Sequence, residues 1–305
     1  MRKNKVNLRK HILFAIILHL CFFLGCNSVK VAETYVDDEA IIRNVASTQI
    51  IDKEKSFSFR VVHKEPNDLN DADFATIVSL DLSGKKLSDI KLLEKFTNLK
   101  ELDLSKNHMM DLKPLEKLTY LQRLTLSYTK IKDIKSLAGL TNLELLALDG
   151  TPVENIKPLA NLITLKELYL FGTKISDISS LSKMTKLEVI MLDGTKIKNV
   201  QPLSNLVNIK SLILPDTIVN DIKPVENLIN LNFLDLSGTK IKDIEPLANL
   251  KQLEILLLNY TEINDIKPLA NLKDLRELYI NNCTNITDKQ IEELQKALPN
   301  LKITR

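Results

Sequence analysis

The sequence is poor in the side chains that most often carry catalysis or hold metals. Its 305 residues include four histidines, three cysteines and no tryptophan. Once the first 25 residues are set aside, only His63 and His108 remain, and they lie in different parts of the chain. No Ser/His/Asp or Cys/His constellation can be assembled from this set, and no metal-ligand spacing appears. We therefore expect a protein without enzymatic activity, metal or cofactor.

Glycine is scarce as well, with seven residues in the whole chain. Five of them share one position of a repeated unit, which predicts turns at strand ends and excludes a phosphate-binding loop. These five are Gly84, Gly150, Gly172, Gly194 and Gly238.

A strong net charge of either sign is also lacking. The formal charge of +3 includes five basic residues in a leader that we expect to be removed, namely Arg2, Lys3, Lys5, Arg9 and Lys10. Without them, 37 basic residues stand against 39 acidic ones, so the mature chain is near −2. This balance does not imply a broad basic surface, and we expect no nucleic-acid partner.

The apolar run near the N-terminus is too short to span a membrane comfortably. It extends from Ile12 to Leu24, follows a basic start and is broken only by His19. Thirteen residues suit a secretory signal better than a transmembrane helix. The run ends in Phe-Leu-Gly-Cys at residues 23–26, which resembles the lipobox of bacterial lipoproteins, with Phe23 in place of the usual leucine.

The resemblance to a lipobox implies that the leader is cut before Cys26 and that this cysteine carries acyl chains. Two or three acyl chains anchor a protein stably, whereas a single chain does not. Cys21 would leave with the leader, so Cys283 would be the one free thiol and no disulfide could form within a mature chain. Cys283 falls on an inward-facing repeat position and is predicted to be a buried structural thiol. The alternative is an ordinary signal peptide followed by an incidental cysteine.

One repeated unit of 22 residues dominates the rest of the chain. In the copy from Leu231 to Gln252, apolar residues stand at positions 1, 4, 6, 11, 14, 17 and 20. Positions 4 and 6 have the spacing of a strand, and the later steps of three suit a 3₁₀ turn. A looser copy begins at Ile77, and the others start without insertion at Leu99, Leu121, Leu143, Leu165, Leu187, Ile209, Leu231, Leu253 and Leu275.

A fixed period in this range is typical of a solenoid. One unit cannot bury seven large apolar side chains alone, but stacked units can, at roughly 1.5–3 kcal/mol for each buried side chain. The pattern therefore predicts an α/β solenoid, with one curved parallel sheet on the concave face and 3₁₀ or short turns on the convex face.

The pattern LxxLxLxxTxIxDIxPLxxL resembles the 22-residue leucine-rich repeat of the bacterial internalins, and it covers about residues 70–305. The ninth position departs from the internalin pattern, because it holds threonine where those repeats usually carry asparagine. Asn107 is the lone asparagine of this row, Cys283 ends it, and the threonines are Thr129, Thr151, Thr173, Thr195, Thr217, Thr239 and Thr261. The resemblance implies that the row caps backbone groups where each strand ends.

Aspartates at position 13 could suggest paired catalytic carboxylates, but their periodicity favours a structural role. Each stands just before the convex turn, where a carboxylate can accept hydrogen bonds from backbone N–H groups, and proline at position 16 fixes the entry angle. The aspartates are Asp89, Asp111, Asp133, Asp177, Asp221, Asp243 and Asp265, and the prolines are Pro114, Pro158, Pro202, Pro224, Pro246 and Pro268.

A row of lysines beyond position 9 has two interpretations. It could contact anionic lipid headgroups or polysaccharide, or it could be a solvated edge that pairs with the position-13 aspartates. We favour the solvated edge. The row comprises Lys130, Lys132, Lys174, Lys196, Lys198, Lys240 and Lys242.

These observations divide the chain into five segments. We expect a lipoprotein signal peptide over residues 1–25, the lipidated cysteine and a tether over 26–36, an N-terminal flank and cap over 37–76, nine leucine-rich repeats over 77–274, and a last repeat with a helical C-terminal cap over 275–305.

Both flanks contain local structure signals. A short amphipathic helix is predicted over Asp37–Val45, and alternation at Phe57, Phe59 and Val61 predicts a strand. The segment from residue 68 to 78 resembles the N-terminal cap of bacterial repeat proteins of this class. At the other end, residues 287–290 form a capping box, Pro299 stops the helix that follows, and a final extended piece closes the chain.

The strand residues that point away from the core carry the clearest functional signal. At positions 3, 5 and 7 the first copies are polar, but later copies hold large apolar residues that the core does not require. The predicted partner-binding residues are Leu145, Tyr169, Phe171, Val189, Met191, Ile213, Phe233, Ile255, Leu257 and Tyr279, with Asp149, Glu167, Asp193 and Asp235 among them. We expect them to lie exposed as a patch with aromatic anchors and an acidic border. The alternative is that strands tolerate apolar residues by propensity alone.

Two classes of function follow from this sequence. The first is a non-enzymatic protein-binding module that captures a protein ligand, a host protein among the candidates, on its concave face. The alternative is a structural scaffold lipoprotein of the cell envelope. In either case we expect an exported, monomeric ectodomain, lipid-anchored through Cys26 to the bacterial envelope at the outer membrane or cell surface.

Overall fold

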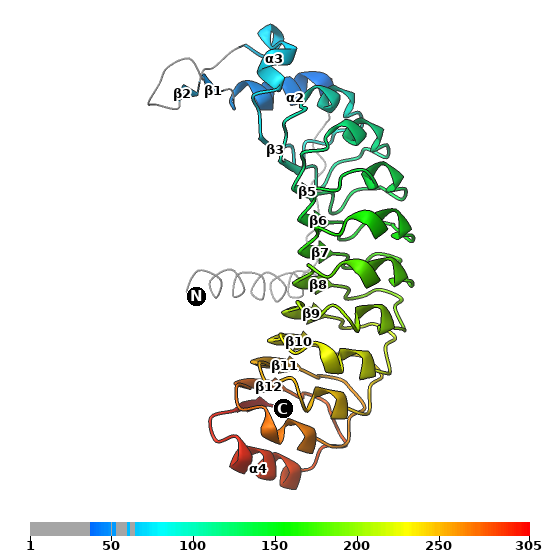
Figure 1. Cartoon of the computed structure of the whole chain (residues 1–305), viewed down its shortest axis with the longest axis vertical. Coiled ribbons are helices and arrows are strands. Elements are labelled where there is room, and N and C mark those ends of the chain that lie inside the picture. The colour runs from blue at the N-terminus through cyan, green and yellow to red at the C-terminus, as the bar shows by residue number, and fades with distance from the viewer. Residues whose placement is uncertain (1–36, 50, 53–59, 62–64) are drawn as a thin grey trace, which may run out of the picture. The chain divides into compact units, whose positions relative to one another are not determined.

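The computed structural model describes residues 37–49, 51–52, 60–61 and 65–305 (Figure 1). The chain divides into two units, residues 1–36 and residues 37–305, and every described residue belongs to the second unit. The predicted signal peptide, Cys26 and the tether lie outside the described residues. So do Phe57 and Phe59 of the predicted flank strand.

Eleven parallel strands form one sheet in sequence order. From β3 to β12 each strand aligns with its neighbour at a separation of one 22-residue repeat, as Leu80 does with Leu102 and Leu102 with Leu124. The strands are β3 (Ser79–Asp81), β4 (Glu101–Asp103), β5 (Arg123–Thr125), β6 (Leu145–Ala147), β7 (Glu167–Tyr169), β8 (Val189–Met191), β9 (Ser211–Ile213), β10 (Phe233–Asp235), β11 (Ile255–Leu257), β12 (Glu277–Tyr279) and β13 (Lys302–Thr304). The predicted solenoid is confirmed.

Short 3₁₀ helices occupy the opposite side of each repeat, and Figure 1 shows them along the outer side of the coil, with the strands along its inner side. They are η2 (Lys91–Lys95), η3 (Lys113–Lys117), η4 (Lys135–Leu137), η5 (Lys157–Asn161), η6 (Ser179–Lys183), η7 (Gln201–Leu203), η8 (Lys223–Asn227), η9 (Glu245–Leu247) and η10 (Lys267–Asn271). Steps of three between apolar residues suit a helix with three residues per turn, so positions 14, 17 and 20 all face the core.

The predicted capping role of position 13 is confirmed. In each repeat that holds aspartate there, one carboxylate oxygen accepts a hydrogen bond from the backbone N–H two residues on, as Asp111 does from Lys113 at 2.8 Å. Asn155 and Asn199 make the same bond with their amide oxygens. The N–H that opens the outer turn is thereby satisfied in every one of these repeats.

The ninth position shows why threonine is a partial substitute for asparagine. Each threonine hydroxyl donates to a leucine carbonyl three residues earlier in its own repeat, as Thr173 does to Leu170 at 2.8 Å. Asn107 makes the equivalent bond to the Leu104 carbonyl at 2.9 Å and also reaches the preceding repeat, where it accepts from the Leu87 N–H and donates to the Leu82 carbonyl. An amide has both donors and an acceptor, so it can join two repeats, whereas the hydroxyl here closes one strand end.

Cys283 is a buried thiol, as predicted, with 2% of its surface exposed. Its sulfur donates to the Leu258 carbonyl of the preceding repeat at 3.0 Å. In this respect the cysteine resembles Asn107 more than the threonines between them.

A second row of bonds between repeats runs along position 22, for which no contact was predicted. The Asn142 side-chain amide donates to the Thr119 carbonyl of the preceding repeat at 2.8 Å. Asn98, Asn208 and Asn230 make equivalent bonds, and Thr164 replaces the amide with a hydroxyl. These side chains satisfy carbonyl groups in the segment that enters each strand.

The N-terminal cap is built from α2 (Asp38–Ser47), η1 (Pro66–Asp68) and α3 (Asp71–Phe74), next to a two-stranded ladder of β1 (Ile51–Asp52) and β2 (Arg60–Val61). Helix α2 confirms the helix predicted from Asp37 onward. Its Asp38 carboxylate accepts hydrogen bonds from the Ser88 N–H, the Ser88 hydroxyl and the Asp89 N–H, which ties the cap to the first outer turn.

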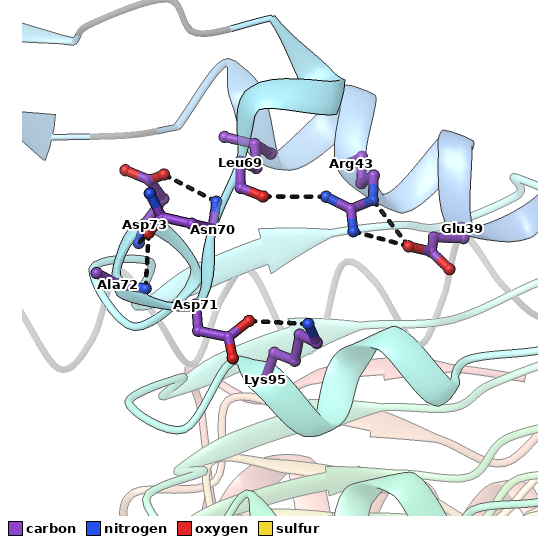
Figure 2. A network of polar contacts seen from close by, with 8 residues as sticks. All are labelled: Glu39, Arg43, Leu69, Asn70, Asp71, Ala72, Asp73 and Lys95. Carbon is purple, nitrogen blue, oxygen red and sulfur yellow. Dashed lines mark hydrogen bonds and ion pairs between the residues drawn. The ribbon is translucent and has the colours of Figure 1, made fainter.

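Polar contacts also link α2 to the segment before α3, and α3 to the first outer turn (Figure 2). Arg43 on α2 pairs with Glu39 and donates to the Leu69 carbonyl at 3.2 Å, and Asp71 on α3 pairs with Lys95 on η2 at 2.8 Å. Beneath them the buried Phe74 ring packs on Phe96, with their centroids 4.8 Å apart. The cap therefore covers the open end of the apolar core.

The C-terminal cap is helix α4 (Asp288–Ala297), which begins at the capping box formed by Thr287 and Gln290, as predicted. The final extended piece is β13, which pairs with β12 and so extends the main sheet by one strand. That pairing was not predicted. Among the described residues, no helix is both long and apolar enough to cross a membrane.

Candidate functional site

The candidate site is the inner face of the sheet, formed by positions 3, 5 and 7 of the repeats that contain β3–β12. Because the strands are parallel and in register, equal positions form three columns across the sheet. In the middle column, for example, Thr125 aligns with Ala147 and Ala147 with Tyr169. Neighbouring members of a column are about 4.8 Å apart, the spacing between paired strands.

The expectation that the ten apolar residues lie exposed on this face is wrong for six of them. Phe233 is 2% exposed and Tyr169 is 8% exposed, and Leu145, Val189, Met191 and Ile213 are buried to a similar degree. Phe171, Ile255, Leu257 and Tyr279 are partly buried. The sequence correctly places the ten residues outside the repeat core, but it does not reveal how closely they pack on one another.

The physical reason is the register of the columns. A large side chain on one strand lies against the side chains at the same position of both neighbouring strands, only one strand spacing away. Tyr169, Met191 and Ile213 follow one another in this way along the middle column. The apolar residues of β6–β10 therefore form a second packed layer, and this layer is the floor of the inner face.

Two tyrosines of the face have their hydroxyl groups committed to neighbours on the same strand. Tyr169 donates to Glu167 at 2.6 Å and Tyr279 donates to Glu277 at 2.5 Å. Burial, together with the charge of Glu167, raises the pKa of Tyr169 above its ordinary value. The hydrogen bond to Glu277 raises the pKa of Tyr279 to about 12. Both side chains stay neutral, so they contribute shape and apolar surface to the face, without charge.

Two aspartates at position 7, the third column of the inner face, have carboxyl groups whose pKa values are raised. Asp149 accepts hydrogen bonds from the Phe171 N–H at 2.9 Å and the Ser127 hydroxyl at 3.3 Å, yet burial raises its pKa to about 6. Burial also raises the pKa of Asp193 to about 7, with smaller contributions from nearby acidic groups. Asp193 Oδ1 is buried and has no hydrogen-bond donor among the described residues. The floor thus holds carboxyl groups that titrate near neutral pH.

The first strands of the sheet present a different surface. Ser79, Asp81 and Glu101 on β3 and β4 are exposed, and Asp103 is partly exposed. The hydrogen bonds that Asp81 accepts from Ser83 lower the pKa of its carboxyl group. This end of the inner face is therefore open and polar, whereas the middle is packed and apolar.

A ladder of charges at position 2 borders the inner face, and the sequence patterns used for prediction did not reveal it. Lys166 pairs with Glu144 at 2.8 Å and Lys210 pairs with Glu188 at 2.6 Å, each across neighbouring repeats. Arg276 and Glu254 continue the row at 3.7 Å. These pairs are partly exposed, so each stabilises the fold by at most about 1 kcal/mol.

The predicted pairing of the lysine row with position-13 aspartates is not present among the described residues. Lys242 of that row pairs instead with Glu262 at 3.2 Å. In the part of the chain that the structure describes, no group of three His, Cys, Asp or Glu side chains is placed to hold a metal ion. The side chains of the inner face offer apolar contact, hydrogen bonding and negative charge, which are the requirements of a binding surface.

Comparison with known proteins identifies a matching family and similar solved structures. A family model described as Leucine Rich repeats (2 copies) matches residues 163–205. The structure of an internalin (inlF) from Listeria monocytogenes is 33% identical, with a TM-score of 0.74, over 88% of this chain and 74% of that chain. Internalin C2 (inlC2) from the same species is 28% identical, with a TM-score of 0.59, over 79% of this chain and 92% of that chain. Among curated proteins no match was found.

A more distant likeness concerns the fold alone. The leucine-rich repeat ectodomain of the plant membrane receptor kinase GASSHO1/SCHENGEN3 from Arabidopsis thaliana, in complex with CASPARIAN STRIP INTEGRITY FACTOR 2, is 23% identical. The match has a TM-score of 0.58 and covers 64% of this chain and 25% of that chain.

Proposed function

The chain belongs to the internalin family of leucine-rich repeat proteins, and we propose that it is a non-enzymatic module that binds a protein partner on the inner face of its sheet. The solenoid supports this role, because stacked repeats form an extended concave surface that a convex partner can enter.

The observation that carries the proposal is the difference between repeats at the inner positions. Core positions hold leucine or a similar aliphatic residue in nearly every copy. The middle column instead changes from Asp81 through Thr125 and Tyr169 to Leu257. The fold accepts small polar and large aromatic residues at these same positions, so stacking does not dictate their identity. Their variety suits recognition of one particular partner.

The burial of the six apolar residues changes their proposed part in binding. Leu145, Val189, Met191, Ile213 and their buried neighbours would hold the floor rigid. Direct contact would come from the side chains that remain partly exposed, namely Phe171, Ile255, Leu257 and Tyr279, and from the polar residues around them. A rigid floor lowers the conformational entropy lost on binding.

Blocking the inner face should abolish capture of the partner. We expect the double variant Thr125→Trp and Leu257→Trp, which fills the middle column in both halves of the sheet, to lose a protein that the unaltered chain retains. The matched control is Ser182→Trp with Asn249→Trp, at exposed positions on the outer side. The measurement is a pull-down with each form from host-cell surface extracts and from bacterial envelope extracts.

A partner that both tryptophan variants retain would place the binding surface elsewhere and contradict the proposal. Suppose that only the inner-face variant loses a partner. The extract from which that partner came then shows whether it is a host ligand or an envelope component. Melting curves of the two variants check that the inner-face substitutions leave the solenoid folded.

We also propose that the protein is exported and anchored to the bacterial envelope by lipid on Cys26. The support is the basic start, the apolar run and the Phe-Leu-Gly-Cys sequence at residues 23–26. An N-terminal anchor would leave the repeats and their inner face free to meet a partner outside the membrane.

Lipidation should depend on Cys26. In cells that process lipoproteins, the unaltered chain is expected to partition into detergent and to yield an acylated N-terminal peptide in mass spectrometry. Cys26→Ala should give an uncleaved or soluble product, while Cys21→Ala, a change in the leader, should still be lipidated. An unmodified mature N-terminus at another residue would refute the anchor.

A further inference from the structure

The inner face carries charge of nearly one sign. Across positions 3, 5 and 7 of the repeats that contain β3–β12 there is one basic residue, Arg123. Against it stand eight acidic residues, Asp81, Glu101, Asp103, Asp149, Glu167, Asp193, Asp235 and Glu277. The position-2 row beside the face is different, because there acidic and basic residues alternate and form ion pairs such as Glu144 with Lys166. The excess of negative charge is therefore a property of the inner face.

Two acidic residues on the first two strands, Asp81 and Asp103, are directly opposed. Asp81 on β3 is in register with Asp103 on β4, and like charges opposite each other in a sheet are destabilising. Among the described residues no salt bridge joins Asp81, Glu101 or Asp103 to a basic side chain. Lys85 interacts with the charge of Asp81, and Arg123 on β5 is in register with Glu101. Neither forms a salt bridge with Asp81 or Asp103, so a cation placed over these two carboxylates would relieve the repulsion between them.

The two opposed carboxylates are also held in position by hydrogen bonds. Asp81 accepts a hydrogen bond from the Ser83 N–H at 2.9 Å, and Asp103 accepts one from the Ser105 N–H at 2.8 Å. The hydrogen bonds from Ser83 also lower the pKa of the Asp81 carboxyl group. Asp81 and Glu101 are exposed, so a partner can reach them.

We propose that the partner docks on the inner face with a basic protein segment, whose lysine or arginine side chains lie over the carboxylates of β3 and β4. This inference rests on the proposed function, because it takes the inner face as the binding surface. Charge complementarity selects this class of partner, and it disfavours nucleic acids and other polyanions, which the same face repels. The packed apolar floor of β6–β10 then receives the remainder of the partner.

The test uses defined peptides with the purified full-length protein. Two fluorescent peptides of equal length, one alternating arginine with serine and the other alternating glutamate with serine, are titrated at low ionic strength. The arginine peptide should bind and the glutamate peptide should not. Added salt should weaken binding of the arginine peptide, because salt screens exposed charges.

The decisive comparison is between two triple variants with the same change in net charge. Asp81→Asn with Glu101→Gln and Asp103→Asn should weaken binding of the arginine peptide roughly tenfold or more. The control, Glu116→Gln with Glu226→Gln and Glu245→Gln, removes three acidic groups from η3, η8 and η9 on the outer side. It should change the affinity less than about twofold, since its charges lie away from the docking surface.

An equal loss of affinity in both triple variants, or equal binding of the glutamate peptide, would overturn the basic-segment proposal. Failure of the proposed function is a separate outcome. A pull-down partner could be lost from the Thr125→Trp and Leu257→Trp variant but retained by the Asp81→Asn, Glu101→Gln and Asp103→Asn variant. In that case the inner face binds a protein, but the acidic residues of β3 and β4 do not contribute to the binding.

Discussion

Ile178→Asp should reduce the free energy of unfolding by at least about 4 kcal/mol, the scale expected when a core aliphatic residue is replaced and a charge is left in an apolar core. Ile178 occupies position 14, just before η6, and is 1% exposed. In a stacked core its side chain also packs against the neighbouring repeats, so the damage is not confined to one unit. At roughly 2–4 °C per kcal/mol for a chain of this size, the melting temperature should fall by about 10 °C.

The control for this variant is two residues away. Ser176→Asp introduces the same charge at an exposed position of the same repeat and should change the unfolding free energy by less than about 0.5 kcal/mol. Melting followed by far-UV circular dichroism compares the two variants. Equal melting temperatures would mean that the assignment of positions 12 and 14 to surface and core is incorrect.

The second large effect concerns pH and the carboxyl group of Asp193, which is partly buried and whose Oδ1 is inaccessible to solvent. Its pKa in the folded chain is about 7, raised from 3.8 chiefly by burial. A group with a raised folded pKa contributes stability that is fully present below the unfolded pKa and is lost as pH rises through the folded value. Between about pH 5.5 and pH 8 the unaltered protein should therefore lose on the order of 2 kcal/mol of unfolding free energy from this group.

Asp193→Asn should remove most of that pH dependence. The stability advantage of the variant over the unaltered chain should grow by about 2 kcal/mol between pH 5.5 and pH 8, when urea unfolding is compared at both values. Asp149, whose pKa is about 6, contributes in the same direction. The unfolding free energy of the variant should therefore still fall with rising pH, but less steeply than that of the unaltered chain. Asp216→Asn is the control, because Asp216 is an exposed acidic neighbour of Asp193. If the control flattens the profile as much as Asp193→Asn does, the burial of Asp193 is not the cause.

The regular part of this fold could be predicted because its signal is repeated. The 22-residue period fixes which residues face the core, and ten consecutive copies make an error in one of them visible against the rest. Strands, 3₁₀ helices and the position-13 caps all follow from that period. Thr287 and Gln290 were equally informative, since a capping box is a local pattern within four residues.

The contacts that were missed depend on residues without such a pattern. Asp38 binds Ser88, fifty positions later in the chain, and nothing in the local sequence of α2 specifies that partner. The packing of Tyr169, Met191 and Ile213 was missed for a related reason. Alternation along one strand gives the face of a side chain, whereas its exposure depends on which residues the neighbouring strands place beside it.

The bonds at the ninth and twenty-second positions bear on how a chain of this kind can change its length. Thr173 and its equivalents bond within their own unit, and Asn142 and its equivalents bond to a carbonyl that nearly every preceding unit offers at the same place. A duplication or deletion of one whole unit would therefore join two surfaces that already fit each other. The gain or loss of any other number of residues would move the position-22 side chains out of line with the carbonyls of the preceding unit and shift the core positions. The solenoid can grow or shrink by recombination in steps of one unit, so the area offered to a partner can vary without a new fold.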